Sequence, residues 1–162
     1  MENVQRGATQ VEPGEGKTLL VLGDLYRFVV ASEETNGAFA VFETTATPGL
    51  PGPPPHIHHR EDEAVYVLEG EFELYVEGNT TTVGPGVFVS IPKGTLHTWS
   101  NAGNAPARIL AMVTPGGFED FFEEVGEPVE APYCPPAGPP DVEKVLAAAP
   151  RYGLEILSPR EG

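Results

Sequence analysis

Residues 53–70 read PPPHIHHREDEAVYVLEG, and this stretch decides how the rest of the chain is interpreted. It holds three of the four histidines of the chain, His56, His58 and His59. His56 and His58 are two positions apart, so on a strand both side chains point to the same face. On one continuous strand Glu63 would point to the opposite face. The four residues before Glu63 are all polar, however, and predict a bend after which Glu63 can face the same point as the two histidines.

The fourth histidine lies in a second window, residues 86–101, which read GVFVSIPKGTLHTWSN. His97 follows the turn signal Pro-Lys-Gly and stands at the start of a strand. Three imidazoles and one carboxylate that converge inside a barrel would bind a divalent metal and leave one or two of its positions open. These four residues, His56, His58, Glu63 and His97, are therefore candidate ligands of a metal ion. A bare His-x-His pair recurs by accident, so the alternative is a solvated polar loop with an unrelated His97.

The chain around these windows consists of short apolar stretches separated by Gly, Pro, Asn and Asp. Stretches rich in Val, Phe, Thr and Tyr are predicted as strands. They cover residues 18–22, 26–31, 38–45, 64–68, 71–76, 80–83, 87–91, 96–100 and 108–113. So many strands without intervening helices indicate a β-sandwich or a closed β-barrel.

The pattern changes beyond the last of these strands. Residues 118–125 carry apolar side chains at helical spacing and acidic ones on the other face, which predicts a short amphipathic helix. Its aromatic stripe is expected to pack as core over an open end of the barrel: Phe118, Phe121 and Phe122. A second helix is predicted from Asp141, its N-cap, to about Ala149, where Pro150 stops it. Residues 154–157 are expected to form a last edge strand.

Length and composition restrict the range of functions. The 162 residues suffice for one domain, and the net charge of −15 disfavours binding to nucleic acid or to an anionic membrane surface. No apolar run exceeds five residues and the N-terminus lacks an apolar segment, so we expect neither a membrane span nor a secretory signal, and a cytoplasmic location. The single cysteine, Cys134, excludes an internal disulfide and is expected to be structural.

The spacing of the two windows resembles the motifs of the cupin superfamily. In the first, His56-Ile57-His58 is followed after four residues by Glu63 and after six more by Gly70; in the second, Gly86 is followed by Pro-Lys-Gly and His97. One departure is Leu50, which stands where the family usually has a glycine. The resemblance implies an all-β cupin jelly-roll barrel with a short C-terminal helical extension. It implies a single domain over residues 1–162, with the barrel at about 18–113 and the helices and tail at about 116–162.

Within that superfamily, residues 53–70, the acidic Phe-rich helix and residues 141–155 are similar to single-domain bacterial cupins of the quercetinase-like group. This resemblance implies a metal-dependent dioxygenase that uses dioxygen and a flavonol-like or other aromatic enol substrate. It also implies a homodimer, for which Tyr66 on the outer face is a candidate interface residue. The ion would be Fe, Ni, Co, Mn, Cu or Zn. Glu63 is the candidate catalytic residue, as a general base for the substrate hydroxyl, with a purely structural ligand as the alternative.

Two other functions stay open. A metal-dependent sugar isomerase or epimerase would need cations for a phosphate or carboxylate, but Arg60, Lys93 and Arg108 are scattered around the motifs. A metal-bearing protein that binds a small ligand without turnover is the non-enzymatic alternative.

Three further side chains lie close to the candidate ligands in the sequence. His59 is expected on the surface or behind the ligands, because it follows His58 directly. Glu61 is the weaker carboxylate candidate, because Glu63 has the family spacing. Trp99 shares a strand face with His97 and is expected to line the cavity.

Overall fold

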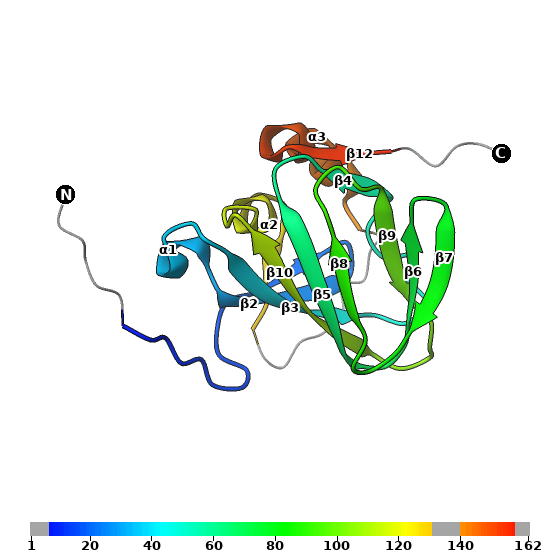
Figure 1. Cartoon of the computed structure of the whole chain (residues 1–162), viewed down its shortest axis with the longest axis horizontal. Helices are drawn as coiled ribbons and strands as arrows, with labels where there is room; N and C mark the ends of the chain where they lie inside the picture. Colours follow the sequence, from blue (N-terminus) through cyan, green and yellow to red (C-terminus); the bar gives the residue numbers. More distant parts are fainter. Residues whose placement is uncertain (1–6, 131–139, 158–162) are drawn as a thin grey trace.

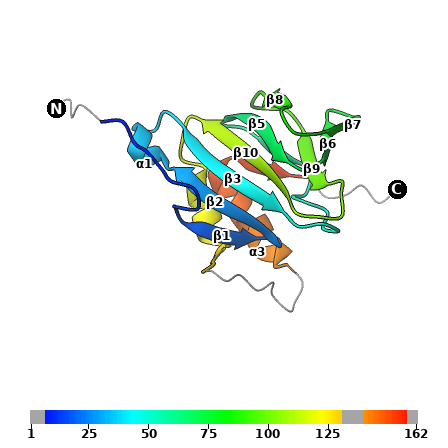
Figure 2. The same ribbon diagram turned by 90° about the horizontal axis from the view of Figure 1, so that it is seen from below.

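The structure is a computed structural model that describes residues 7–130 and 140–157. Within these residues the strands form two antiparallel sheets of seven and five strands, in the orders β11-β1-β2-β3-β10-β5-β8 and β12-β4-β9-β6-β7. The larger sheet contains Thr18–Val21 (β1), Asp24–Val30 (β2), Ala40–Ala46 (β3), Asp62–Glu69 (β5), Phe88–Ile91 (β8), Ala107–Thr114 (β10) and Glu127–Pro128 (β11). The smaller sheet contains His56–His58 (β4), Phe72–Val76 (β6), Asn79–Val83 (β7), His97–Asn101 (β9) and Leu154–Ile156 (β12). Figure 2 shows β1, β2, β3, β10 and β5 side by side in this order.

The core lies between the inward faces of the two sheets. Every second residue of β3 is buried, and β10 shows the same alternation over most of its length. Apolar side chains from both sheets join in one cluster, with Val65 and Val67 from the larger sheet and Phe72, Leu74 and Trp99 from the smaller one. The period of two along each strand therefore determines which side chains enter the barrel.

A β-bulge in β5 reverses this alternation. Val67 pairs with Ile109 and Glu69 pairs with Arg108, so one residue of β5, Leu68, has no partner in β10. The extra residue turns the side chain of Glu69 outward, although Val67 points inward two positions before it. Glu69 can therefore join the charged residues on the outer face of the sheet.

Four of these outer residues form an ion-pair ladder across neighbouring strands. Arg27 lies 3.1 Å from Glu43, Glu43 lies 3.1 Å from Arg108, and Arg108 lies 2.9 Å from Glu69. The members come from β2, β3, β10 and β5, which neighbour one another in the sheet. We refer to these four residues as the outer ladder.

The C-terminal region adds helices on one side of the barrel (Figure 1). Glu119–Val125 forms helix α2, as the apolar spacing predicts, and Phe122 stacks on Tyr26 with ring centroids 4.5 Å apart. Val142–Ala148 forms helix α3, and its predicted N-cap, Asp141, accepts a hydrogen bond from the backbone of Lys144. The α-helix ends at Ala148, one residue before the predicted end, and Pro150 lies in the 3₁₀ helix Ala149–Tyr152 that follows it.

The last strand returns to the smaller sheet. Strand β12 pairs with β4, and Leu154 lies opposite His58. Figure 1 shows β12 and α3 above β4 at one end of the barrel. The sequence predicted β12 but not its partner, and it did not predict the four-residue helix Ser32–Thr35 (α1), which is too short for an apolar periodicity. The architecture confirms the predicted β-barrel with a C-terminal helical extension.

Candidate metal centre

Two strands of the smaller sheet hold the three histidines. His56 and His58 both point into the barrel, because β4 is buried at its first and third residues. His97 begins β9 and lies directly opposite His56, with ring centroids 4.3 Å apart. The turn before β9 is tied to β4 by the backbone hydrogen bond from Gly94 to the carbonyl of His58, 2.8 Å long. The pairing of β4 with β9 thus converts two distant sequence windows into one site.

Glu63 reaches the same site from the larger sheet. The chain bends after His58, and β5 begins at Asp62, so Glu63 points inward as the polar run predicted. Its Oε2 atom lies 3.0 Å from Nε2 of His97 and 3.4 Å from Nε2 of His58. One possible ligand atom from each of the four side chains lies within 4.8 Å of all the others. All four side chains are buried, with between 1% and 9% of each residue exposed.

The outer nitrogens of two histidines are held by backbone oxygens. Nδ1 of His56 lies 2.8 Å from the carbonyl oxygen of Pro54, and Nδ1 of His97 lies 3.0 Å from that of Thr95. A carbonyl oxygen only accepts, so Nδ1 donates in both rings and Nε2 is left for the cluster. Such fixed outer contacts are typical of histidines that bind metals.

Two members of the cluster have the protonation states that metal binding needs. Burial raises the pKa of Glu63, but the hydrogen bond from His97 and the nearby imidazoles outweigh it and lower the pKa to about 2. Burial, together with His97 and His58, lowers the pKa of His56 to about 3. Glu63 is therefore ionised and His56 neutral at neutral pH, which are the forms that coordinate an ion.

At His97 the neighbouring Glu63 stabilises positive charge. Burial lowers the pKa of His97, but the hydrogen bond to Glu63 outweighs this effect and leaves the pKa raised. The contact that raises this pKa joins Nε2 of His97 to Glu63, at the place where the ligand atoms converge. Three imidazoles and one carboxylate suit a divalent transition metal, so the residues present fit such an ion.

A glycine next to the motif makes room for β9. A Cβ atom on Gly52 would lie 1.8 Å from the carbonyl oxygen of Trp99, and the φ angle of Gly52 is +73°. Any larger residue would collide with the strand that carries His97. Gly52 thus supplies the close approach in a loop where Leu50 replaces the usual family glycine.

An apolar pocket of about 620 Å³, counting the solvent at its mouth, adjoins the cluster. His56, His58 and Glu63 form one part of its wall. The rest is mainly apolar and includes Trp99, as its strand position predicted. Among the described residues, none of those that line the pocket is a lysine or an arginine. A mainly apolar lining of this kind is typical of small-molecule sites with few charged contacts.

The aromatic stripe of α2 both packs on the barrel and lines this pocket. Phe118 meets the ring of His58 edge-on, with centroids 4.5 Å apart. Phe122 packs between Tyr26 and Phe42. All three phenylalanines of the stripe are buried and belong to the pocket wall. The prediction of core packing is thus confirmed, and the stripe also lies where it would contact a ligand.

Other candidate residues lie away from the cluster. His59 is exposed and pairs with Glu155 at 2.6 Å. Glu61 is buried, but its carboxylate lies behind His58 and outside the set of four ligand atoms. Tyr66 is on the outer face, 43% exposed, and Cys134 lies outside the described residues.

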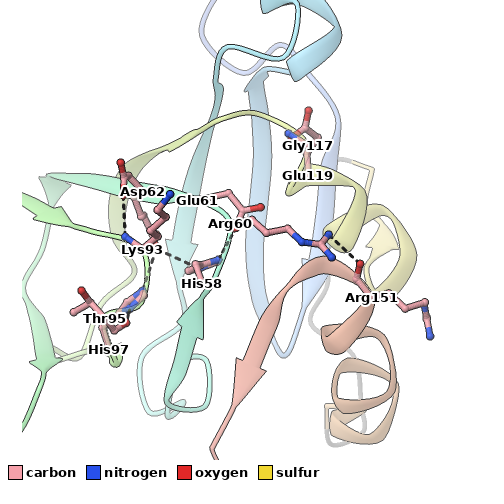
Figure 3. Close-up of polar contacts among 11 residues, drawn as sticks. His58, Arg60, Glu61, Asp62, Lys93, Thr95, His97, Gly117, Glu119 and Arg151 are labelled. Carbon is pink, nitrogen blue, oxygen red and sulfur yellow. Dashed lines mark hydrogen bonds and ion pairs between the residues drawn. The ribbon is translucent and has the colours of Figure 1, made fainter.

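Two of the three scattered cations, Arg60 and Arg108, have structural partners for their charged groups. Arg60 donates to the backbone oxygen of Arg151, and Arg108 belongs to the outer ladder. Lys93 is exposed, and its backbone nitrogen donates to Asp62 (Figure 3). These contacts agree with the sequence-based view that the three cations do not form an anion site.

Sequence reasoning missed two polar side chains of the pocket wall. Tyr26 and Thr44 lie opposite each other on β2 and β3, and both are buried. The hydroxyl of Thr44 has no hydrogen-bond partner among the described residues. The alternation along β3 was the available signal, because it directs Thr44 inward together with Phe42 and Ala46.

No helix in the described part of the chain is long and apolar enough to cross a membrane.

The comparisons with known proteins agree with this geometry. Residues 42–113 match the family model for the cupin domain. Quercetin 2,3-dioxygenase of Bacillus subtilis (strain 168) is 31% identical over 151 residues, which is 92% of this chain and 44% of that protein. Quercetin 2,3-dioxygenase of Aspergillus japonicus is 31% identical over 121 residues, 68% of this chain and 34% of that protein. The solved structure of KdgF from Halomonas sp. shares the fold, with a TM-score of 0.60 at 21% identity over 70% of this chain and 98% of that one.

A β-barrel that directs three histidines and one glutamate inward from these two motifs defines a cupin domain. The chain belongs to the cupin superfamily, and within it the chain is similar to the quercetinase-like cupins, which confirms the resemblance predicted from the motifs. The chain spans less than half the length of the two curated relatives.

Proposed function

We propose that the chain is a metal-dependent dioxygenase that acts on a flavonol-like or other aromatic enol compound. The observation that carries the proposal is the buried cluster of His56, His58, Glu63 and His97 at the wall of an apolar, aromatic pocket. The two quercetin dioxygenases among the relatives support this choice of reaction. We assign the four residues as the ligands of one divalent transition metal. When bound, such an ion supplies Lewis acidity and a place where substrate and dioxygen can meet.

Glu63 is assigned a second role as general base. Both of its short contacts to the histidines use Oε2, which leaves Oε1 to accept a proton from a substrate hydroxyl. The proton transfer converts the hydroxyl into an oxyanion. Because the pKa of Glu63 is about 2, the carboxylate is ionised but only weakly basic. The hydroxyl must therefore be acidified, and an enol beside a divalent ion meets this condition.

The pocket wall positions the substrate and excludes water. Phe118 packs against His58, so a flat ring that enters beside the cluster meets an aromatic wall. Phe121 and Phe122 continue this wall. The buried hydroxyls of Tyr26 and Thr44 offer hydrogen bonds to polar groups of the substrate.

Oxygen uptake tests the proposal most directly. The full chain, loaded in turn with each of Fe, Ni, Co, Mn, Cu and Zn, is offered a panel of flavonols and catechols. Uptake is expected with at least one metal and a flavonol-like compound, and not with the His58→Ala variant. Full metal loading without uptake on any compound would contradict the proposal.

Two alternatives predict other outcomes of the same assay. A metal-bearing binding protein would retain a flavonol in equilibrium dialysis without consuming oxygen. A sugar isomerase or epimerase would neither bind the flavonol nor consume oxygen. The phosphate or carboxylate of its substrate would need a cation that the described pocket wall does not supply.

A further inference from the structure

Glu61 is a buried carboxylate that does not belong to the four-residue cluster. Only 6% of the residue is exposed. Its Oε2 atom lies 3.5 Å from Nδ1 of His58, and Figure 3 draws the two side chains facing each other. Neither atom has a hydrogen-bond partner among the described residues. The Nδ1 atom of His58 and the Oε2 atom of Glu61 are a matched donor and acceptor. Their separation is a few tenths of an ångström longer than an ordinary hydrogen bond.

The bend itself does not explain why a carboxylate is buried here. Asp62 already ties the bend to the neighbouring turn by accepting a hydrogen bond from the backbone of Lys93, at 2.9 Å. Gly94 fixes the end of β4 through the carbonyl of His58. Burial of a carboxylate without a compensating partner is unfavourable, so an apolar residue would serve a merely structural bend better. The position of Glu61 therefore points to a partner that gains from negative charge.

That partner is the outer nitrogen of a ligand histidine. His56 and His97 direct Nδ1 to backbone carbonyls, which are neutral acceptors. His58 alone among the three directs Nδ1 to a carboxylate. A carboxylate behind a metal-binding imidazole fixes its tautomer and ring orientation and strengthens the inner nitrogen as a ligand.

We propose that Glu61 is a positioning residue of the metal centre, which accepts the Nδ1 hydrogen of His58 and so directs Nε2 of that ring into the cluster. Its negative charge also offsets part of the charge of a divalent ion, since Glu63 supplies only one of the two charges needed. The inference rests on the metal centre assigned in the proposed function, but it does not depend on which reaction that centre performs.

Metal affinity of three variants tests this role. Glu61→Ala removes both the acceptor and the charge, whereas Glu61→Gln removes the charge and keeps an oxygen that can accept the Nδ1 hydrogen. Glu155→Gln is the matched control, because Glu155 pairs with an exposed histidine, His59, that is not part of the cluster. Each full-length variant is titrated with Co²⁺ against a chelator, and the visible absorption spectrum of the bound Co²⁺ is recorded.

The Ala variant is expected to raise the dissociation constant about 10- to 100-fold, the usual effect of losing such an outer partner. The Gln variant is expected to raise it by less, and both are expected to shift the Co²⁺ absorption bands, while Glu155→Gln matches the wild type. Dissociation constants within twofold of the wild type with unchanged spectra would overturn the inference. Equal losses in the Ala and Gln variants would also overturn it, because charge alone would then account for the effect.

Two further outcomes are distinguishable. If the Ala variant does not fold, the Co²⁺ dissociation constant of the Glu61→Gln variant is compared with that of the Glu155→Gln control. Identical dissociation constants in these two variants would overturn the inference. If the wild type binds Co²⁺ more tightly than the Glu61 variants but consumes no oxygen, the result would contradict the proposed dioxygenase activity and support the role of Glu61.

Discussion

One cluster of four polar side chains lies inside the barrel, and a second cluster of four lies on the outer face of the larger sheet. The inner cluster contains His56, His58, Glu63 and His97, and the outer ladder contains Arg27, Glu43, Arg108 and Glu69. Strand β5 contributes one glutamate to each, and the bulge at Leu68 determines which face the second one takes. The inner members are at most 9% exposed, whereas the side chains of Arg108 and Glu69 are 40% and 60% exposed.

The two clusters differ both in burial and in the groups that surround each carboxylate. Within residues 7–130 and 140–157 no arginine or lysine shares the pocket wall with Glu63, and its charge is stabilised by imidazoles whose protons an ion can replace. The outer ladder is already neutralised by opposite charges within 3.1 Å, and its Arg108 and Glu69 side chains are open to water. Removing an inner side chain should therefore abolish a function, whereas removing an outer one should cost a fraction of a kcal/mol.

The largest effect is expected from Glu63→Gln, which keeps a coordinating oxygen and removes the base. With metal bound, turnover should fall about 100- to 10,000-fold, the usual contribution of a general base. Oxygen uptake at saturating substrate measures this loss, and a substrate already ionised at high pH should restore part of it. A variant that retains metal and normal turnover would mean that Glu63 is only a ligand. If the variant loses the metal, the pH–rate profile of the wild type decides.

The second effect concerns the cover of the inner cluster. Phe122→Ala removes a buried ring that packs on Tyr26 and Phe42, so the free energy of unfolding should fall by about 3 kcal/mol. Phe88→Ala is the matched control, because Phe88 is 63% exposed on the outer face and should change stability by less than about 0.5 kcal/mol. Urea unfolding followed by fluorescence compares the two. Equal midpoints would mean that the helix stripe is not packed on the barrel.

A third test uses Asp24, a buried carboxylate without a cation. It is 2% exposed and accepts a hydrogen bond from the backbone of Thr47, but burial outweighs that bond and raises its pKa from 3.8 to about 6. The folded state thus holds the proton more tightly than the unfolded chain. The contribution of Asp24 to stability is therefore greatest below about pH 4 and falls as the pH rises to about 6.

Asp24→Asn should remove this dependence. At pH 7 the variant should be more stable than the wild type by up to about 3 kcal/mol, since each pKa unit corresponds to about 1.4 kcal/mol. Below pH 4 the gain should disappear. Urea unfolding between pH 4 and pH 8 measures the difference between the two proteins. A difference that does not vary with pH would contradict a raised pKa at this position.

The smallest effect is expected in the outer ladder. Arg108→Ala breaks two ion pairs, yet the free energy of unfolding should fall by less than about 1 kcal/mol, because the Arg108 side chain is 40% exposed and its charge is screened by water and salt. The loss should shrink further in 1 M salt. A loss of several kcal/mol would remove the distinction between the two clusters.

Part of the cluster could be predicted from local patterns, whereas its union with His97, which lies in a distant window, followed from the resemblance to the cupin motifs. The period of two on a strand places His56 and His58 on one face, and the polar run after them predicts the bend that brings Glu63 inward. The helical spacing of the aromatic residues likewise predicted α2. These signals depend only on a few neighbouring residues, so they can be recognised without knowledge of the tertiary structure.

The remaining features depend on distant pairing. Glu61 lies in a polar run that reads as surface, and nothing local indicates that its carboxylate is buried behind His58. The pairing of β12 with β4 joins residues nearly 100 positions apart, and the bulge at Leu68 appears only when β5 is aligned with β10. Register and burial of this kind follow from the assembled sheets.

The metal content of the untagged chain tests the central claim most directly. The wild type, incubated with excess divalent metal and then freed of unbound ions, should contain close to one equivalent per chain. His97→Ala removes one of the four ligands and the partner of Glu63, so its metal content should fall sharply, whereas Arg108→Ala should retain the full equivalent. Full occupancy in the His97→Ala variant, or no bound metal in the wild type, would contradict the account.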